Sequence, residues 1–74
     1  MDNQEKEKIL KQAILFQRDV KFDYVTKMFE IKFGRKIKPL EVKDKWFYGN
    51  DLEDKNNLKR FLVHGIQKLE VIQI

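Results

Sequence analysis

The sequence contains no cysteine and no serine, and it has only one threonine and one histidine. Without cysteine the chain can form no disulfide and offers no thiolate ligand to a metal. A single histidine leaves too few imidazoles for the histidine-based sites that zinc prefers. Nucleophilic triads built on serine or cysteine are excluded for the same reason. We therefore expect no catalytic residue, no metal and no cofactor, and we interpret the chain as non-enzymatic.

Long apolar runs and glycine-rich loops are also missing. No run approaches the roughly 18 apolar residues of a membrane span, and the start, MDNQEKEK, does not resemble a signal peptide. These absences predict a cytoplasmic protein without a membrane partner. The three glycines (Gly34, Gly49 and Gly65) lie too far apart to form a phosphate-cradling loop. We expect no small-molecule substrate.

The residues that are present suit one globular domain spanning residues 1–74. Hydrophobic residues make up 42% of the chain and aromatic residues 12%, which is too apolar for a disordered segment. A chain of this length buries only about 60% of the surface that its unfolded form exposes, so most large apolar residues are needed inside.

The net charge of +4 is concentrated in one stretch. The window from Lys32 to Lys45 holds six basic residues against Glu41 and Asp44, which is 6 − 2 = +4, and the rest of the chain is neutral. A local excess of this kind is typical of a site for phosphate or an acidic partner. The alternative is a solvated face that only aids solubility. The candidate nucleic-acid-binding residues are Lys32, Arg35, Lys36, Lys38, Lys43, Lys45 and Tyr48.

The first half of the chain is predicted to form a helix, a strand and a second helix. Apolar residues recur at helical spacing within 4–17, which predicts a helix. Val20–Phe22 alternates and predicts a short strand. The spacing of apolar residues within 24–33 predicts a second helix. Gly34 then suits the left-handed position that ends a helix.

The second half predicts two more helices and a closing strand. Pro39 opens a predicted helix that stops near Gly49. Residues 50–57 carry turn chemistry, for which a solvated loop and a single helical turn are equally good readings. Residues 58–68 predict the last helix, and residues 69–74 the last strand.

The resulting fold class is mostly α with a small β element, in the order α-β-α-α-α-β. Strands this short need a partner, so we expect Val20–Phe22 to pair with residues 69–74. Helices closed by a tiny sheet form a winged-helix-like plan. A pure helical bundle is the alternative if the last strand instead continues the last helix.

Three aromatic residues follow the basic window. In a domain this small we expect Trp46 and Phe47 in the core, and the alternative left open is that they are exposed and stack on unpaired bases. Tyr48 lies beside a glycine and is expected to be partly exposed, where it could stack on a base. Lysines neutralise phosphate without reading sequence, and Arg35 is the one arginine in the window. Binding of nucleic acid should be weak and salt-sensitive, with little base readout.

With these elements placed, the chain resembles the LOTUS (OST-HTH) domain, a small winged-helix-like module. Ile9-Leu10 and Ile14-Leu15 look like its first helix, and Phe33-Gly34-Arg35-Lys36-Ile37 with Pro39 resembles its turn motif. Tyr48-Gly49 and the pattern from Leu58 to Ile72 look like its closing part, with residues 50–57 as an insertion. The resemblance implies RNA, or an RNA-associated protein such as a DEAD-box helicase, as partner.

A second resemblance covers only Phe29 to Trp46, which looks like the start of the DnaD-type primosome domain and implies DNA as partner. The function expected is therefore a binding module for RNA or an RNA-associated protein, acting through a basic turn-helix surface. Two alternatives stay open. One is a protein-interaction domain with exposed apolar helix faces, for which Leu15, Phe16, Ile31 and Ile37 are candidates. The other is a small DNA-binding regulator or phage replication accessory.

Overall fold

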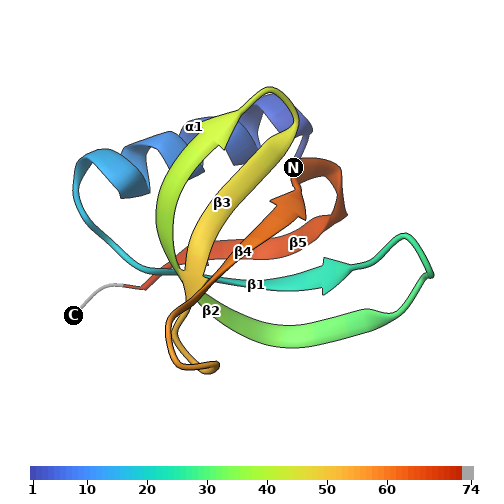
Figure 1. Ribbon diagram of the computed structural model, residues 1–74. Coiled ribbons are helices and arrows are strands. Elements are labelled where there is room, and N and C mark those ends of the chain that lie inside the picture. Colours follow the sequence, from blue (N-terminus) through green and yellow to red (C-terminus); the bar gives the residue numbers. More distant parts are fainter. Residues whose placement is uncertain (73–74) are drawn as a thin grey trace.

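The computed structural model describes residues 1–72 and shows one helix followed by a five-stranded antiparallel sheet (Figure 1). Strands account for about half of these residues, so the protein is mostly β. The elements are α1 (Asn3–Leu15), β1 (Val20–Val25), β2 (Ile31–Lys43), β3 (Trp46–Asp51), β4 (Asn57–Leu62), the short 3-10 helix η1 (Val63–Gly65) and β5 (Ile66–Val71).

Helix α1 forms where the apolar spacing predicts it. The Asp2 side chain caps its start by accepting a hydrogen bond from the Glu5 N–H at 2.8 Å. Leu10 and Ala13 face the sheet and are almost fully buried. The predicted helix at 4–17 is therefore confirmed.

The sheet has the strand order β4-β3-β2-β1-β5, so the first and last strands are neighbours. Val20 lies opposite Val71 and Lys21 opposite Glu70. This confirms the predicted pairing of Val20–Phe22 with the C-terminal segment. The last two predicted strand residues, Gln73 and Ile74, lie outside the described residues.

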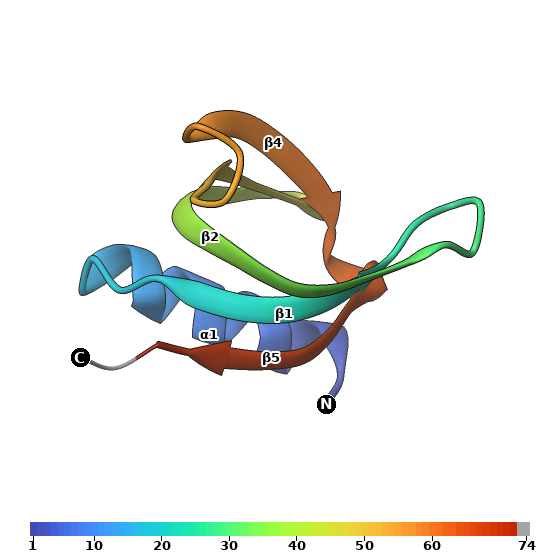
Figure 2. The same ribbon diagram turned by 90° about the horizontal axis from the view of Figure 1, so that it is seen from below.

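Three bulges bend the sheet. β2 has one residue more than β1 near Gly34, whose φ is +62°, and one more than β3 near Leu40. β5 has one more than β1 near Lys68, whose φ is 52°. Bulges increase the local twist of a sheet, so the strands curl around one core. Figure 2 shows β4 and β5 on opposite sides of the bent sheet, joined at one end through η1.

Aromatic side chains fill the space that the curled sheet encloses. The rings of Phe22 and Phe61 are 5.2 Å apart between centroids, and Phe47 lies 6.0 Å from each. Such pairs add about 0.5–1.5 kcal/mol each to the burial of the rings. The Tyr24 ring lies 5.0 Å from the Phe61 ring between centroids, and its hydroxyl accepts a hydrogen bond from the Leu62 N–H at 2.9 Å.

The prediction of a mostly α, winged-helix-like fold in the order α-β-α-α-α-β is wrong. The predicted helix at 24–33 is the end of β1, a turn and the start of β2. Its apolar stripe is not a buried face, because Met28, Phe29 and Phe33 are 81%, 87% and 73% exposed. The RNA and helicase partners implied by the LOTUS resemblance lose the support of that fold.

The other two predicted helices are also strands. The segment from Pro39 to Gly49 is the β2–β3 hairpin, with Asp44 at φ 56° in its turn. Residues 58–68 form β4, η1 and the start of β5. Within 50–57 the loop reading was the better one, since residues 52–56 form a turn between β3 and β4.

A search of residues 1–72 finds no helix with the length and apolarity needed to cross a membrane.

Candidate nucleic-acid interface

Strand β3 has two faces of different character. Phe47, Gly49 and Asp51 are buried, whereas the alternate residues Trp46, Tyr48 and Asn50 are partly exposed. Alternation follows from strand geometry, because successive side chains point to opposite faces of a sheet. The aromatic run is thereby divided: Phe47 belongs to the core, as predicted, and Trp46 and Tyr48 share the outer surface.

The neighbouring strands continue this outer surface, because residues directly opposite each other share a face. Trp46 lies opposite Lys43 on β2 and Leu62 on β4, and Tyr48 lies opposite Glu41 and Arg60. We call this surface the aromatic face. Its exposed or partly exposed residues are Lys38, Glu41, Lys43, Trp46, Tyr48, Asn50, Leu58 and Arg60, whereas Leu62, opposite Trp46, is buried.

Two cations lie against the Trp46 ring. The Arg60 guanidinium carbon is 4.4 Å from the ring centroid, and the Lys27 Nζ is 6.0 Å away. The negative face of an indole attracts a cation at such distances. Lys27 lies in the β1–β2 turn and Arg60 on β4, so the two cations beside the Trp46 ring come from separate parts of the chain.

The aromatic face is cationic as a whole. It carries Lys38, Lys43 and Arg60 against Glu41, which is 3 − 1 = +2, and Lys27 adds a further charge beside Trp46. The arrangement offers flat rings and cations on one surface, which suits the binding of an extended anionic and aromatic ligand.

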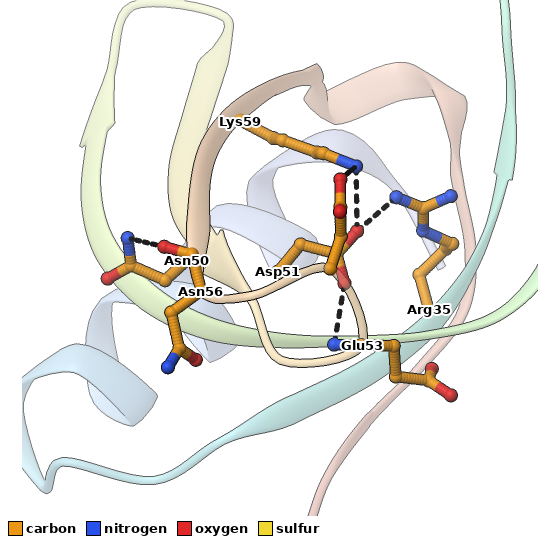
Figure 3. Close-up of polar contacts among 7 residues, drawn as sticks. Arg35, Asn50, Asp51, Glu53, Asn56 and Lys59 are labelled. Atoms are coloured by element: carbon orange, nitrogen blue, oxygen red, sulfur yellow. Dashed lines mark hydrogen bonds and ion pairs between the residues drawn. The ribbon is translucent and has the colours of Figure 1, made fainter.

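A separate charged cluster lies on the buried side of β3 (Figure 3). The Asp51 carboxylate, which is 2% exposed, accepts hydrogen bonds from the Arg35 guanidinium and from Lys59 Nζ at 3.1 Å. It also accepts the Glu53 N–H at 3.0 Å, and Lys59 pairs with Asp54 at 2.8 Å. Asp51 thus ties together β2, β4 and the turn after β3.

The contacts of Asp51 decide its charge state. Burial raises its pKa, but the Glu53 N–H bond, the Lys59 hydrogen bond and the nearby Arg35 charge outweigh burial and leave the pKa below the ordinary value. Lys59 has a raised pKa because of its bonds to Asp54 and Asp51. The cluster is a satisfied ionic clamp. Within residues 1–72 no grouping of three or more His, Asp or Glu side chains could hold a metal ion.

The predicted site residues do not form one patch. Lys38, Lys43 and Tyr48 lie on the aromatic face, and Lys45 lies in the adjoining β2–β3 turn. The others lie elsewhere: Lys32 pairs with Glu30 at 3.7 Å, Lys36 lies opposite Lys21, and Arg35 is committed to Asp51. The 13-residue strand β2 distributes these charges along its length and over both faces of the sheet, whereas a helix would have brought them together.

The sequence reasoning missed three members of the site. Trp46 was assigned to the core, and neither Arg60 nor Lys27 lies in the basic window. A usable signal is the run of three aromatic residues from Trp46 to Tyr48, because aromatic residues are enriched in strands and successive strand residues point to opposite faces of a sheet. The cations beside Trp46 follow from strand pairing, which the sequence does not reveal.

Comparison with known proteins supports the fold. No model of a protein family matches the chain, and no curated protein does. Among solved structures, proteasome accessory factor B/C (PafBC) of Arthrobacter aurescens is similar over 97% of this chain, with a TM-score of 0.83 and 18% sequence identity. The chain spans only 12% of the length of PafBC. At this identity the likeness establishes the shared fold alone.

Proposed function

We propose that this domain binds single-stranded nucleic acid on its aromatic face. The observation that carries the proposal is the exposure of Trp46 and Tyr48 side by side on a sheet surface that Arg60, Lys43 and Lys38 make cationic. Aromatic rings that stack on bases, combined with cations that follow the backbone, are the usual means of binding unpaired strands. Each stacked base contributes about 1–3 kcal/mol.

The spacing on β3 suits two bases. Trp46 and Tyr48 are two residues apart, which is about 7 Å along a strand. Two unstacked bases can therefore lie on the two rings once the Arg60 guanidinium moves off the Trp46 ring, with the phosphates near Lys43 and Arg60. Asn50 is the one amide on this face, so base identity is read by few hydrogen bonds.

The charge count sets the salt dependence. Lys27, Lys38, Lys43 and Arg60 can neutralise three to four phosphates, so log Kd should change with log salt by a slope of about 2–3 for a single strand. We expect weak binding that is strongest at low salt. This expectation keeps the salt sensitivity predicted from composition but moves the site to the aromatic face.

The test uses Trp46 as its own reporter, because it is the only tryptophan. Single-stranded DNA, single-stranded RNA and a duplex of each are titrated at low salt while Trp46 fluorescence and ligand anisotropy are recorded. We expect single strands to quench Trp46 and to bind better than duplexes. The relative affinity of RNA and DNA distinguishes the two sources of the ligand.

Matched variants separate the aromatic face from general charge. Tyr48→Ala and Lys43→Glu should weaken binding about tenfold, which corresponds to the loss of one stack or one contact. Phe16→Ala and Lys8→Glu change the same residue types on or beside α1 and should leave binding intact. Absence of quenching at low salt, or equal loss in both sets of variants, would refute the proposal.

A protein-interaction role is a second candidate, because the end of α1 exposes two adjacent apolar residues. Leu15 is 74% and Phe16 67% exposed, whereas Ile37, another candidate for such a surface, is fully buried. Large exposed apolar residues that lie together mark interaction sites. If Leu15→Ser with Phe16→Ser leaves the chain folded but abolishes a complex that survives high salt, this candidate is favoured over nucleic-acid binding.

A further inference from the structure

The connection between β1 and β2 is an apolar tip that leaves the body of the protein. In Figures 1 and 2 this blue-green to green segment extends away from the other elements. Met28 and Phe29 at the tip are 81% and 87% exposed, and Ile31 and Phe33 behind them are 52% and 73% exposed. Four large apolar side chains within six residues are more than a folded surface normally leaves in water.

Three hydrogen bonds close the turn at the tip. The Thr26 N–H donates to the Glu30 carbonyl at 2.9 Å, and the Phe29 N–H donates to the Thr26 carbonyl at 2.9 Å. The Glu30 N–H donates to the Thr26 hydroxyl at 3.2 Å. These bonds reduce the number of unpaired backbone groups that the turn would carry into a medium without water, where such groups are costly.

Positive charge lies behind the apolar tip. From Lys21 to Lys36 the hairpin has five cations against Asp23 and Glu30, which is 5 − 2 = +3. Glu30 is paired with Lys32 at 3.7 Å, and Arg35 with Asp51. Lys21 and Lys36 lie directly opposite each other and are both exposed, and neither forms an ion pair within residues 1–72, although Lys21 also lies opposite Glu70 on β5.

The order of these groups matches the layers of a lipid surface. Ile31 is two residues from Phe29 and Lys32 is three, which is about 7 and 10 Å along an extended chain. Peripheral elements bury their apolar side chains about 5–10 Å deep, at the boundary of headgroups and acyl chains. The lysines would then lie at the level of anionic headgroups, each contributing attraction over a Debye length of about 8 Å.

We propose that the β1–β2 hairpin is a membrane-surface anchor that inserts Met28 and Phe29 into anionic lipid. A second copy of the chain is a poorer occupant, because two such hairpins would bring the same excess of lysine together. The expectation of no membrane partner rested on the lack of a spanning run, which a peripheral hairpin does not need. The anchor rests on Met28, Phe29 and the cations at the base of the hairpin, and Lys27 is the one residue that it shares with the nucleic-acid proposal.

Vesicle pelleting tests the anchor. The full chain is mixed with vesicles of phosphatidylglycerol and phosphatidylcholine in equal parts, or of phosphatidylcholine alone, at low and at physiological salt. We expect binding to the anionic vesicles only, weakened by salt. Met28→Ser with Phe29→Ser should reduce the binding constant at least about tenfold, whereas Leu58→Ser, an exposed apolar residue on β4, should not.

Several outcomes would overturn the inference. Failure of the unmodified chain to pellet with anionic vesicles at low salt is one, and equal binding by the Met28/Phe29 variant is another, since it would indicate adsorption by charge alone. If the unmodified chain sediments as a dimer and that variant as a monomer, the tip instead binds a second copy. Tyr48→Ala should keep its vesicle binding, so failure of the nucleic-acid proposal remains distinguishable.

Discussion

The two halves of β2 have similar sequences and opposite environments. From Ile31 to Lys36 the strand pairs only with β1 in the part of the chain that the structure describes, and both Ile31 and Phe33 are exposed. From Lys38 onward its partner among the described residues is β3 alone. This second half, from Ile37 to Lys43, lies where α1 packs on the sheet, and Ile37 and Pro39 are buried. Apolar residues therefore become core only where another element covers them.

The two halves of β2 therefore have different roles, one in stability and the other in binding. The covered half of β2 belongs to a core made from every strand and α1. The uncovered half, Ile31 to Lys36, is held in place by its pairing with β1, and its apolar side chains stay exposed and available to a partner. Substitutions on the two halves should consequently separate stability from binding.

The largest difference in stability is expected between variants of two phenylalanines, one buried and one exposed. Phe47 is fully buried and touches Phe22 and Phe61, so Phe47→Ala should lower the free energy of unfolding by about 3–5 kcal/mol. In a domain of this size that loss leaves much of the chain unfolded. Phe33→Ala should change it by less than about 0.5 kcal/mol. Urea unfolding followed by circular dichroism measures both, and similar losses would contradict the contrast.

The same contrast explains what sequence could predict. Helix α1 and the pairing of β1 with β5 were predicted because their apolar residues meet a core directly. The segment from Val25 to Phe33 was misread because its exposed apolar residues fall at helical spacing by coincidence. Nothing in a single sequence tells an exposed stripe from a buried one.

The remaining strands were not predicted because the turns that join them lack the usual sequence signals of hairpins. The β2–β3 turn uses Asp44 and Lys45 rather than the asparagine–glycine pair typical of tight hairpins. Gly34 does adopt the left-handed conformation predicted for it, but within a bulge instead of at a helix end. Pro39 lies in a strand beside another bulge, one of the few places a sheet accepts proline.

The next largest effect is expected where the two halves of β2 are tied together. Arg35 on the uncovered half pairs with Asp51, which lies opposite Ile37 at the start of the covered half. Asp51→Asn should lower the free energy of unfolding by about 2–3 kcal/mol, less than for fully buried ion pairs because both cations keep some water. Denaturant unfolding at neutral pH measures the loss, and an unchanged midpoint would contradict the role of the clamp.

The pH dependence should differ in the same variant. Because the pKa of Asp51 is lower in the folded protein, its contribution is present above the unfolded value near 4 and is lost as the pH falls through the folded pKa. The unmodified chain should therefore lose stability in acid more steeply than Asp51→Asn. The pKa of Asp54 is also lowered, by Lys59, so a shallower acid dependence should remain. Equal slopes would contradict this expectation.

Two glycines allow a finer comparison of the two halves of β2, because Gly34 lies in the uncovered half and Gly49 on β3 lies opposite Pro39 in the covered half. A Cβ on Gly49 would lie 2.3 Å from the Ile37 Cγ2 and 2.7 Å from the Lys38 carbonyl, so Gly49→Ala should cost about 1–3 kcal/mol. At Gly34 a Cβ meets nothing closer than Lys21 at 3.7 Å, and only the positive φ resists a side chain. Gly34→Ala should cost about 1 kcal/mol. Thermal unfolding orders the two variants, and the reverse order would contradict the packing described.

The smallest effect concerns the helix that covers the sheet. Lys6 on α1 is 6% exposed, and burial lowers its pKa because the charged ammonium is disfavoured there. At neutral pH the folded state bears the cost of that charge, so Lys6→Met should raise Tm by roughly 2–4 °C, or about 0.5 kcal/mol. Calorimetry measures the shift. A lower Tm would show that the ammonium stabilises the covered side.

The pairing of β1 with β5 also governs how the protein folds. Val20 and Val71 are neighbours in the sheet although they are 51 positions apart along the chain, and β5 reaches β1 only after β4 and η1 have turned back. Contacts this distant must wait for a long loop to close, which places folding among the slower small domains, in milliseconds to seconds. On the ribosome, the sheet can be completed only after the segment up to Val71 has emerged.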